Sequence, residues 1–278
     1  MYIYSKSFCN LDSFSKFLEK GRTRAAFLNR ADGPASEKAS SYRTEWTGTA
    51  SFDEADRLFQ YGDEKSAAKM APAALTKAAD VPAVDLRARR VRSVAGFSPN
   101  VPAVLQGRPK TMYKLVRQNV NTKVVTFCYD CASDWTIDSE VRAAAALKLV
   151  NTILGIEKKG YRVNLYVCAC MRGTSEAVGA FVKIKDSGAY MDRKKMAYPL
   201  INTSFFRRHM FKFMETAEGL KEKVWAKYYG YAIDKDRAGH ELRLKIAEAA
   251  GVHVENIVSY YDIKDLDEAG IAALLMRK

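Results

Sequence analysis

The chain has 278 residues, 48% of them hydrophobic, and a formal net charge of +13. This length allows one or two domains with a sizeable core, while no apolar run reaches the roughly 18 residues that would cross a bilayer. Residues 1–20 lack a continuous apolar stretch of the signal-peptide type, so we expect a cytoplasmic protein without a membrane partner.

The positive charge favours an encounter with a polyanion. A basic surface attracts nucleic acid and provides the cations that neutralise its phosphates. The alternative is a surface of scattered lysines and arginines that keeps the protein soluble by repulsion. Charge therefore supports a nucleic-acid partner without identifying it.

Few elements are expected near the N-terminus. We predict that residues 1–50 are mostly irregular, with a short helix near 13–18 and a loop at 31–41. Ser51 and Glu54 have the spacing of a capping box, which predicts a helix that begins there and ends at Gly62. A second short helix is expected over 63–70.

Arginines then alternate with apolar residues, and this period-2 alternation is typical of a strand with one basic face. Prolines interrupt the chain before a short helix or an extended lead-in at 112–119. We interpret residues 1–119 as an N-terminal extension that is mostly helical and basic. The alternating arginines are Arg87, Arg89, Arg90 and Arg92.

The pattern changes at residue 123. A β-branched and aromatic run at 124–129 predicts a buried parallel strand, followed by a helix over 138–159 and a second strand over 161–169. We expect residues 120–278 to form a Rossmann-like α/β sheet with helices on both faces. Later strands are expected at 177–185, 224–233 and 257–261, and later helices at 192–197, 204–217, 236–250 and 266–275.

Ligands of open α/β sheets bind at the carboxyl ends of the strands, where Asp130 follows the first predicted strand. This segment resembles the von Willebrand factor A-type family, whose Rossmann-like domain often carries a magnesium-binding Asp-x-Ser-x-Ser motif. Ala132 and Asp134 stand at its two serine positions. The resemblance implies a von Willebrand A-like domain over 120–278 with a degenerate Mg²⁺ site at Asp130, Ser133 and Asp134. The alternative is that both aspartates cap turns.

Three other segments resemble an uncharacterised family encoded by phages and mobile elements. They are residues 51–55 (SFDEA), 95–102 (AGFSPNVP) and 199–208 (PLINTSFFRR). This resemblance spans nearly the whole chain. It implies a viral or mobile-element origin and has no activity attached to it.

Cysteine pairs end the first two strands of the α/β domain: Cys128 with Cys131, and Cys168 with Cys170. Adjacent parallel strands bring such pairs together, and four thiolates can bind zinc. Because both pairs lie on sheet strands, cysteines that pack as small hydrophobes are the favoured interpretation. No phosphate-binding glycine motif and no nucleophile elbow is present, which argues against a dinucleotide enzyme or a hydrolase.

Basic clusters interleaved with aromatic residues carry the functional hypothesis, because cations neutralise phosphates and aromatic rings stack on unpaired bases. We expect a non-enzymatic protein of phage type that binds single-stranded nucleic acid, RNA more than DNA. Two alternatives stay open: a protein-interaction module at the Asp130 edge, and a metal-dependent nuclease using the same carboxylates. No cofactor other than Mg²⁺ is suggested. The expected nucleic-acid contacts are Arg87, Arg89, Arg90, Arg92, Arg108, Lys110, Lys114, Arg193, Lys194, Lys195, Arg207 and Arg208.

Overall fold

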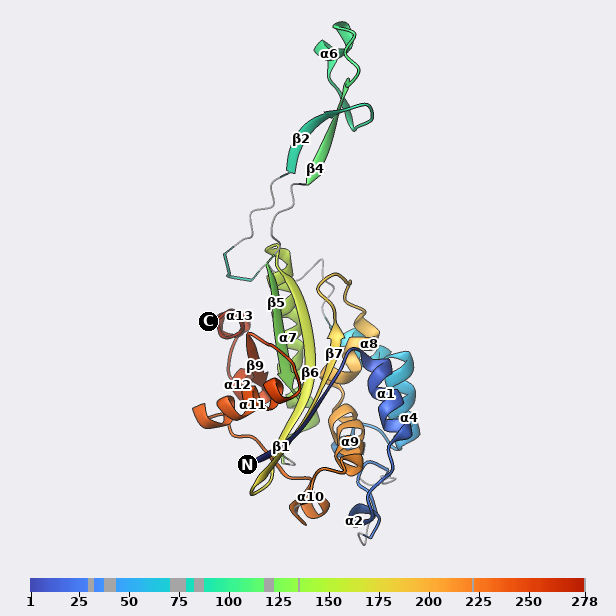
Figure 1. The fold of residues 1–278 in the computed structure, drawn as a ribbon, viewed down its shortest axis with the longest axis vertical. Helices are drawn as coiled ribbons and strands as arrows, with labels where there is room; N and C mark the ends of the chain where they lie inside the picture. The colour runs from blue at the N-terminus through green and yellow to red at the C-terminus, as the bar shows by residue number, and fades with distance from the viewer. Residues whose placement is uncertain are drawn as a thin grey trace.

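The computed structural model describes residues 1–29, 33–37, 44–70, 79–82, 88–117, 123–134, 136–221 and 223–277. Their strands form a six-stranded sheet and a three-stranded sheet (Figure 1). The strands are β1 (Tyr2–Phe8), β2 (Ala88–Ser93), β3 (Ser98–Pro99), β4 (Met112–Arg117), β5 (Val124–Asp130), β6 (Arg162–Arg172), β7 (Glu176–Lys185), β8 (Tyr231–Ala232) and β9 (Asn256–Ser259). The helices are α1 (Leu11–Lys20), α2 (Ala25–Leu28), α3 (Thr44–Thr47), α4 (Phe52–Tyr61), α5 (Glu64–Lys69), α6 (Val101–Leu105), α7 (Ser139–Lys158), α8 (Arg193–Ile201), the π-helical η1 (Phe205–Met210), α9 (Phe211–Thr216), α10 (Lys223–Tyr228), α11 (Arg237–Ala249), α12 (Tyr260–Ile263) and α13 (Glu268–Leu275).

The large sheet is mixed. Its strand order is β1-β7-β6-β5-β9, and β8 pairs with β6 off this path. β5 runs parallel to both of its neighbours, β6 and β9, whereas β6 and β7 are antiparallel. The parallel β5–α7–β6 unit predicted from the sequence is confirmed, and so is the α/β fold class.

Helices cover both faces of this sheet, and the alternating side chains of β5 divide between them. Phe127 and Tyr129 belong to the larger core, while Cys128 packs in a smaller core with Ile246 of α11. α11 approaches closely, because a Cβ at Gly179 of β7 would lie 2.2 Å from the Cγ2 atom of Ile246. Only glycine fits at this position without a shift of the Ile246 side chain.

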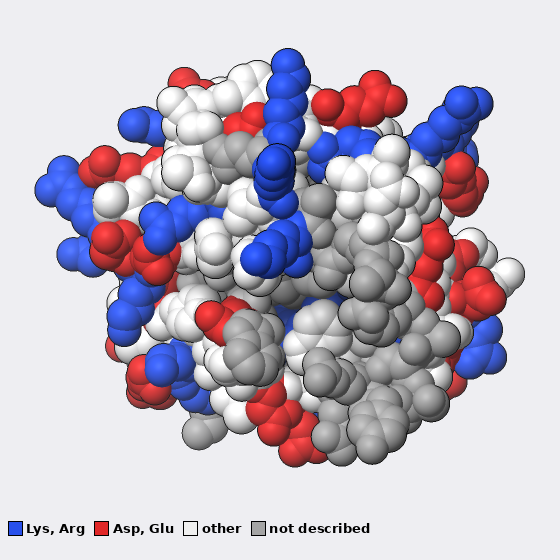
Figure 2. All heavy atoms as spheres, turned by 90° about the horizontal axis from the view of Figure 1, so that it is seen from below, with Lys and Arg blue, Asp and Glu red and all other residues white. Residues whose placement is uncertain are grey.

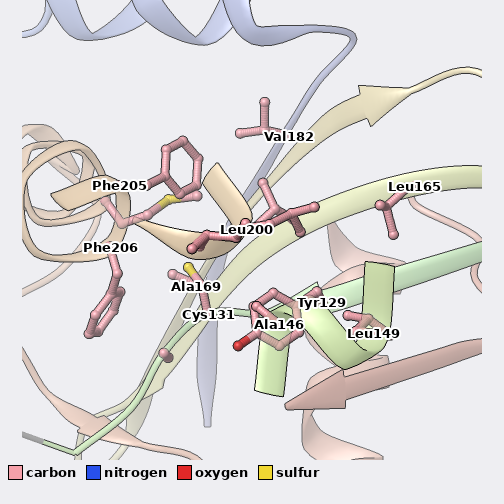
Figure 3. Close-up of a cluster of buried hydrophobic side chains, with 14 of the residues drawn as sticks. Tyr129, Cys131, Ala146, Leu149, Leu165, Ala169, Val182, Leu200, Phe205 and Phe206 are labelled. Carbon is pink, nitrogen blue, oxygen red and sulfur yellow. The ribbon is translucent and has the colours of Figure 1, made fainter. Parts of the chain in front are cut away.

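The larger core joins the sheet to the helices on the opposite face from α11. Figure 3 shows its side chains from β5, β6 and β7 gathered against those of α7, α8 and η1. Phe205 and Phe206 of η1 are both buried there. All six residues of η1 are buried, so Arg207, Arg208 and His209 lie in the interior together with the apolar residues of the same segment.

The N-terminus contributes a strand to the large sheet. β1 pairs in parallel with β7 over its whole length, so the prediction that residues 1–50 are mostly irregular was wrong. The sheet therefore includes a strand from the predicted extension, and the boundary expected at 119/120 does not mark where the sheet begins. The helix predicted after Ser51 is confirmed as α4: the Ser51 hydroxyl accepts from the Glu54 N–H, while the Glu54 carboxylate accepts from Ala50.

One predicted strand is partly a helix. A strand was expected over 224–233, but helix α10 covers 224–228 and the strand is limited to β8. The buried indole of Trp225 donates to the Glu176 carboxylate at 2.8 Å, so a tertiary contact outweighs the β propensity of the aromatic residues here. In the part of the chain that the structure describes, no helix is both long and apolar enough to span a membrane.

Candidate nucleic-acid interface and carboxyl-edge cavity

The three-stranded sheet with α6, which we call the arm (residues 88–117), stands apart from the large sheet (Figure 1). Its middle strand, β4, pairs in antiparallel fashion with β2 and β3. The basic strand predicted from the alternating arginines is thus confirmed as β2. The arm contains no aspartate or glutamate, and its basic residues are Arg89, Arg90, Arg92, Arg108, Lys110, Lys114 and Arg117.

The register of β2 on β4 places two of these cations beside aromatic and apolar side chains. Arg92 lies opposite Tyr113, and Arg90 lies opposite Leu115, so all four share one face of the arm. The Arg90 guanidinium is 6.0 Å from the centre of the Phe97 ring. Lys114 is exposed on the other face, and Arg108 and Lys110 are exposed in the segment before β4. Arg87 and the side chain of Arg89 lie outside the described residues.

The arm has almost no core of its own. Phe97 is 58% exposed, Val94 74% and Leu105 82%, while Ala103 of α6 is buried. Exposed apolar side chains gathered on one small element are typical of a surface that another molecule covers. The arm therefore combines uncompensated positive charge with exposed aromatic and aliphatic groups.

The basic residues expected at 193–195 have mixed roles. Lys195 is exposed, and Lys194 forms a 2.9 Å ion pair with Glu64 on the surface. Arg193 donates instead to the carbonyl oxygens of Ala67 and Met70, which fastens α5 to α8. Only the two lysines are available to a partner at this position.

Arg207 and Arg208 are not surface residues, contrary to the prediction. Arg208 is fully buried and donates to the Thr49 hydroxyl at 2.8 Å, the Thr49 carbonyl at 2.8 Å and the Ser36 carbonyl at 3.0 Å. Arg207 stacks on the Trp46 ring at 4.4 Å and donates to the Trp46 carbonyl. Arg208 joins loops to the core, whereas Arg207 lines a cavity described below.

Asp130 is buried at the end of β5, on the face covered by α11. One carboxylate oxygen accepts from the N–H groups of Ala132 and Cys170, both at 3.1 Å, and the other lies 3.2 Å from the Nε atom of Arg243. Burial raises the pKa of Asp130 from 3.8 to about 6, although Arg243 and the two N–H groups oppose this shift. Both carboxylate oxygens of Asp130 thus have partners within the protein.

We expect a pH dependence of stability from this group. The folded protein binds the Asp130 proton more tightly than the unfolded chain does, because the folded pKa is about 6 and the ordinary value is 3.8. The resulting stabilisation is full below about pH 4 and is lost as the pH rises through about 6, a loss of about 3 kcal/mol. Urea unfolding from pH 4 to 7 should show it as a difference between the native chain and Asp130→Asn. Parallel pH profiles for the two proteins would contradict it.

Both aspartates of the predicted Mg²⁺ site have protein partners. Asp134 is exposed, and its carboxylate accepts from the N–H and the hydroxyl of Thr136 at 3.1 Å, which is an Asx turn. Asp130 already pairs with Arg243. The described geometry favours structural roles for both aspartates, which weakens the nuclease hypothesis as well.

The four strand cysteines do not form one zinc centre. Cys131 belongs to the larger core, whereas Cys128, Cys168 and Cys170 belong to the smaller core on the other side of the sheet. An odd separation along an extended strand puts Cys128 and Cys131 on opposite faces. Potential ligand atoms of Asp130, Cys168 and Cys170 do lie within 4.8 Å of one another. However, burial raises the pKa of both thiols, which disfavours the thiolates that bind metals.

A cavity of about 710 Å³ opens at the carboxyl edge of β5 and β6, and sequence reasoning did not find it. Ser133 and Asp134 after β5, Arg172 at the end of β6 and Tyr261 after β9 line it. This is the edge at which open α/β sheets bind ligands. Tyr229 also lines it with a backbone φ of 61°, in the left-handed region that non-glycine residues rarely adopt.

The cavity wall is rich in aromatic and basic side chains. Its rings include Trp46, Phe206, Phe211, Tyr229 and Tyr231, and its cations are Arg172, Arg207, Lys227 and Lys235. Figure 2 shows this end of the molecule, with lysine and arginine side chains over the middle of the face and carboxylates between and around them. The only local sequence signal was the Asp130 edge, because the lining comes from segments far apart in the chain.

Comparisons with known proteins give a family and no activity. A family model described as "Domain of unknown function (DUF7192)" matches residues 3–268. No curated protein and no solved structure matches the chain.

Proposed function

The chain belongs to the DUF7192 family, a domain of unknown function, and we propose that it binds single-stranded nucleic acid through its arm. The observation that carries the proposal is the composition of residues 88–117, which include seven arginines and lysines (Arg89, Arg90, Arg92, Arg108, Lys110, Lys114 and Arg117) and no acidic residue. Arginine and lysine side chains neutralise phosphates. Because the arm has no acidic residue of its own, its arginines and lysines can pair with the phosphates of a ligand.

The aromatic rings of the arm favour a single strand over a duplex. Phe97 is 58% exposed beside Arg90, and Tyr113 lies next to Arg92 across the ladder. Unpaired bases stack on aromatic side chains and on guanidinium planes, while the stacked bases of a duplex leave no face for this contact. We propose RNA as the natural form and a binding role rather than catalysis.

We expect the variant Arg90→Gln/Arg92→Gln/Lys114→Gln to bind a ten-nucleotide oligo(U) at least about 30-fold more weakly at low salt than the native chain. The slope of log K against log salt concentration should fall by about 2, since each lost phosphate contact on a single strand contributes about 0.7. Fluorescence anisotropy over a salt series measures both quantities, and oligo(dT) and a duplex of the same length test the preference for RNA and for a single strand.

A matched control separates the arm from the net charge. Lys16→Gln/Lys20→Gln/Lys245→Gln removes three exposed cations from α1 and α11 and so the same total charge. At about 0.1 M salt this variant should lose less than about threefold in affinity, because distant surface charges are then screened within about 10 Å. Equal losses in both variants, or binding that ignores salt, would overturn the proposal. A protein retained by the arm after nuclease treatment, with no affinity for oligo(U), would favour a protein partner instead.

A further inference from the structure

The cavity at the carboxyl edge contains positive charge that the described residues do not neutralise. Arg207 lines it, and Arg142 lies directly behind, with its guanidinium 5.7 Å from the ring of the lining residue Phe206. Among the described residues, the two arginines donate only to backbone carbonyls, those of Cys131, Trp46 and Asp134. Described arginines that pair with carboxylates are Arg172, Arg237 and Arg243, so Arg142 and Arg207 have no such partner within the described ranges.

Unpartnered polar atoms mark the same place. The Ser133 hydroxyl and the Nε and Nη1 atoms of Arg142 are buried without a hydrogen-bond partner. Ser133 is 6% exposed and lines the cavity. Buried polar groups in proteins are nearly always satisfied, and a buried guanidinium without a counter-charge is costly. Burial, and to a smaller extent the neighbouring Arg142, lower the pKa of Arg207 from 12.5 to about 9, although the Asp134 carboxylate opposes this shift.

The carboxylates of the wall, by contrast, are already engaged. Asp234 forms a 2.7 Å ion pair with Arg172, Asp236 caps α11 through the Gly239 N–H, and Asp134 caps the turn at Thr136. The groups that remain able to bind a ligand are therefore the hydrogen-bond donors and cations at the inner end, and they suit an anion with acceptor oxygens. Around that end the wall is aromatic, with Trp46, Phe211 and Tyr231 among its rings, and it suits a flat group.

We infer that this cavity binds the phosphate and base of a nucleotide. The phosphate accepts hydrogen bonds from Arg207 and Ser133 with the charge of Arg142 behind it, and the base lies against the aromatic wall. The volume of about 710 Å³ is in the range of small-molecule sites. The nucleotide is either a free nucleoside monophosphate or the phosphorylated end of a nucleic-acid strand. The inference rests on the proposed function and deepens it, although the cavity lies at the carboxyl end of β5 and the arm in Figure 1 lies beyond the other end of that strand.

The test uses isothermal titration calorimetry on the full chain with four probes: AMP, adenosine, and a penta-adenylate with or without a 5′-phosphate. We expect a phosphorylated probe to bind at least about tenfold more tightly than its unphosphorylated counterpart. Ser133→Ala should weaken this probe about three- to tenfold, and Arg207→Gln about 30-fold or more. Ser133→Ala removes one buried, unpartnered oxygen, so it keeps the fold and the test intact.

The probes also distinguish the two sources of the phosphate. Binding of AMP identifies a free nucleotide, whereas binding of only the phosphorylated oligomer identifies a strand end. The arm variant Arg90→Gln/Arg92→Gln/Lys114→Gln should leave the AMP affinity unchanged and remove only the phosphate-independent affinity for the oligomers, so failure of the arm and failure of the cavity are separable. The inference is overturned if phosphate brings no gain, or if Ser133→Ala and Arg207→Gln bind as tightly as the native chain.

Discussion

Replacing Arg243 by methionine is expected to lower the free energy of unfolding by about 3–5 kcal/mol at pH 7. Arg243 is 1% exposed on α11, and its Nε atom lies 3.2 Å from the Asp130 carboxylate. A second carboxylate, that of Asp262, lies 3.7 Å from Nη1. Without the guanidinium, Asp130 is left as a buried charge, and the carbonyl oxygens of Ile233 and Asp234 lose their donor.

The double variant Asp130→Asn/Arg243→Met isolates the charge. It should be more stable than the sum of the two single losses predicts, by about 1–3 kcal/mol, because neither partner is then left ionised and alone. Arg243→Met should also recover part of its loss at pH 5, where Asp130 takes up a proton. Urea unfolding of the three variants at both pH values measures this. A loss below about 1 kcal/mol for Arg243→Met would show that the ion pair does not hold α11 on the sheet.

The sequence predicted the position of Asp130 and not its role. The β-branched run before it fixes a buried strand that ends there, and this placement is confirmed. Arg243 comes from a helix far along the chain, and no local pattern connects the two residues. A carboxylate after a strand is therefore equally compatible with a metal site and with an ion pair, and only the tertiary fold distinguishes them.

The cysteines show a signal that was present in the sequence. Once 124–130 is read as a strand, the separation of Cys128 and Cys131 by three residues puts them on opposite faces. Cys168 and Cys170, two residues apart, share a face, and their Sγ atoms are 3.7 Å apart. Alternation alone thus argues against a four-thiolate centre, whatever the distance between the strands.

Other differences had no such signal. β1 is a short edge strand with serine and lysine in it, so its sequence resembles a polar N-terminal segment until β7 is there to pair with it. The arm could be predicted as basic and extended from its alternation, but its exposure could not, because apolar residues such as Leu105 and Val94 usually indicate a core. The cavity is lined by residues that are far apart in the chain, so it could be located only from the tertiary fold.

Substitution of two neighbouring arginines, Arg207 and Arg208, is expected to affect stability very differently. Arg208→Gln should lower the free energy of unfolding by about 3 kcal/mol or more, because a shorter side chain cannot reach both the Thr49 and Ser36 carbonyls, and buried acceptors are left without donors. Arg207→Gln should change it by less than about 1 kcal/mol, since the lost contact with Trp46 is offset by relief of a buried charge beside Arg142.

The comparison of these two variants separates a side chain that serves the fold from one that serves a ligand. Thermal or urea unfolding of both, without ligand, gives the stabilities, and AMP titration gives the binding. If Arg207→Gln costs as much stability as Arg208→Gln, Arg207 is a structural residue and its charge is not available to a ligand. If the Arg207→Gln variant is as stable as the native chain but no longer binds AMP, the Arg207 charge contributes to ligand binding and not to the stability of the fold.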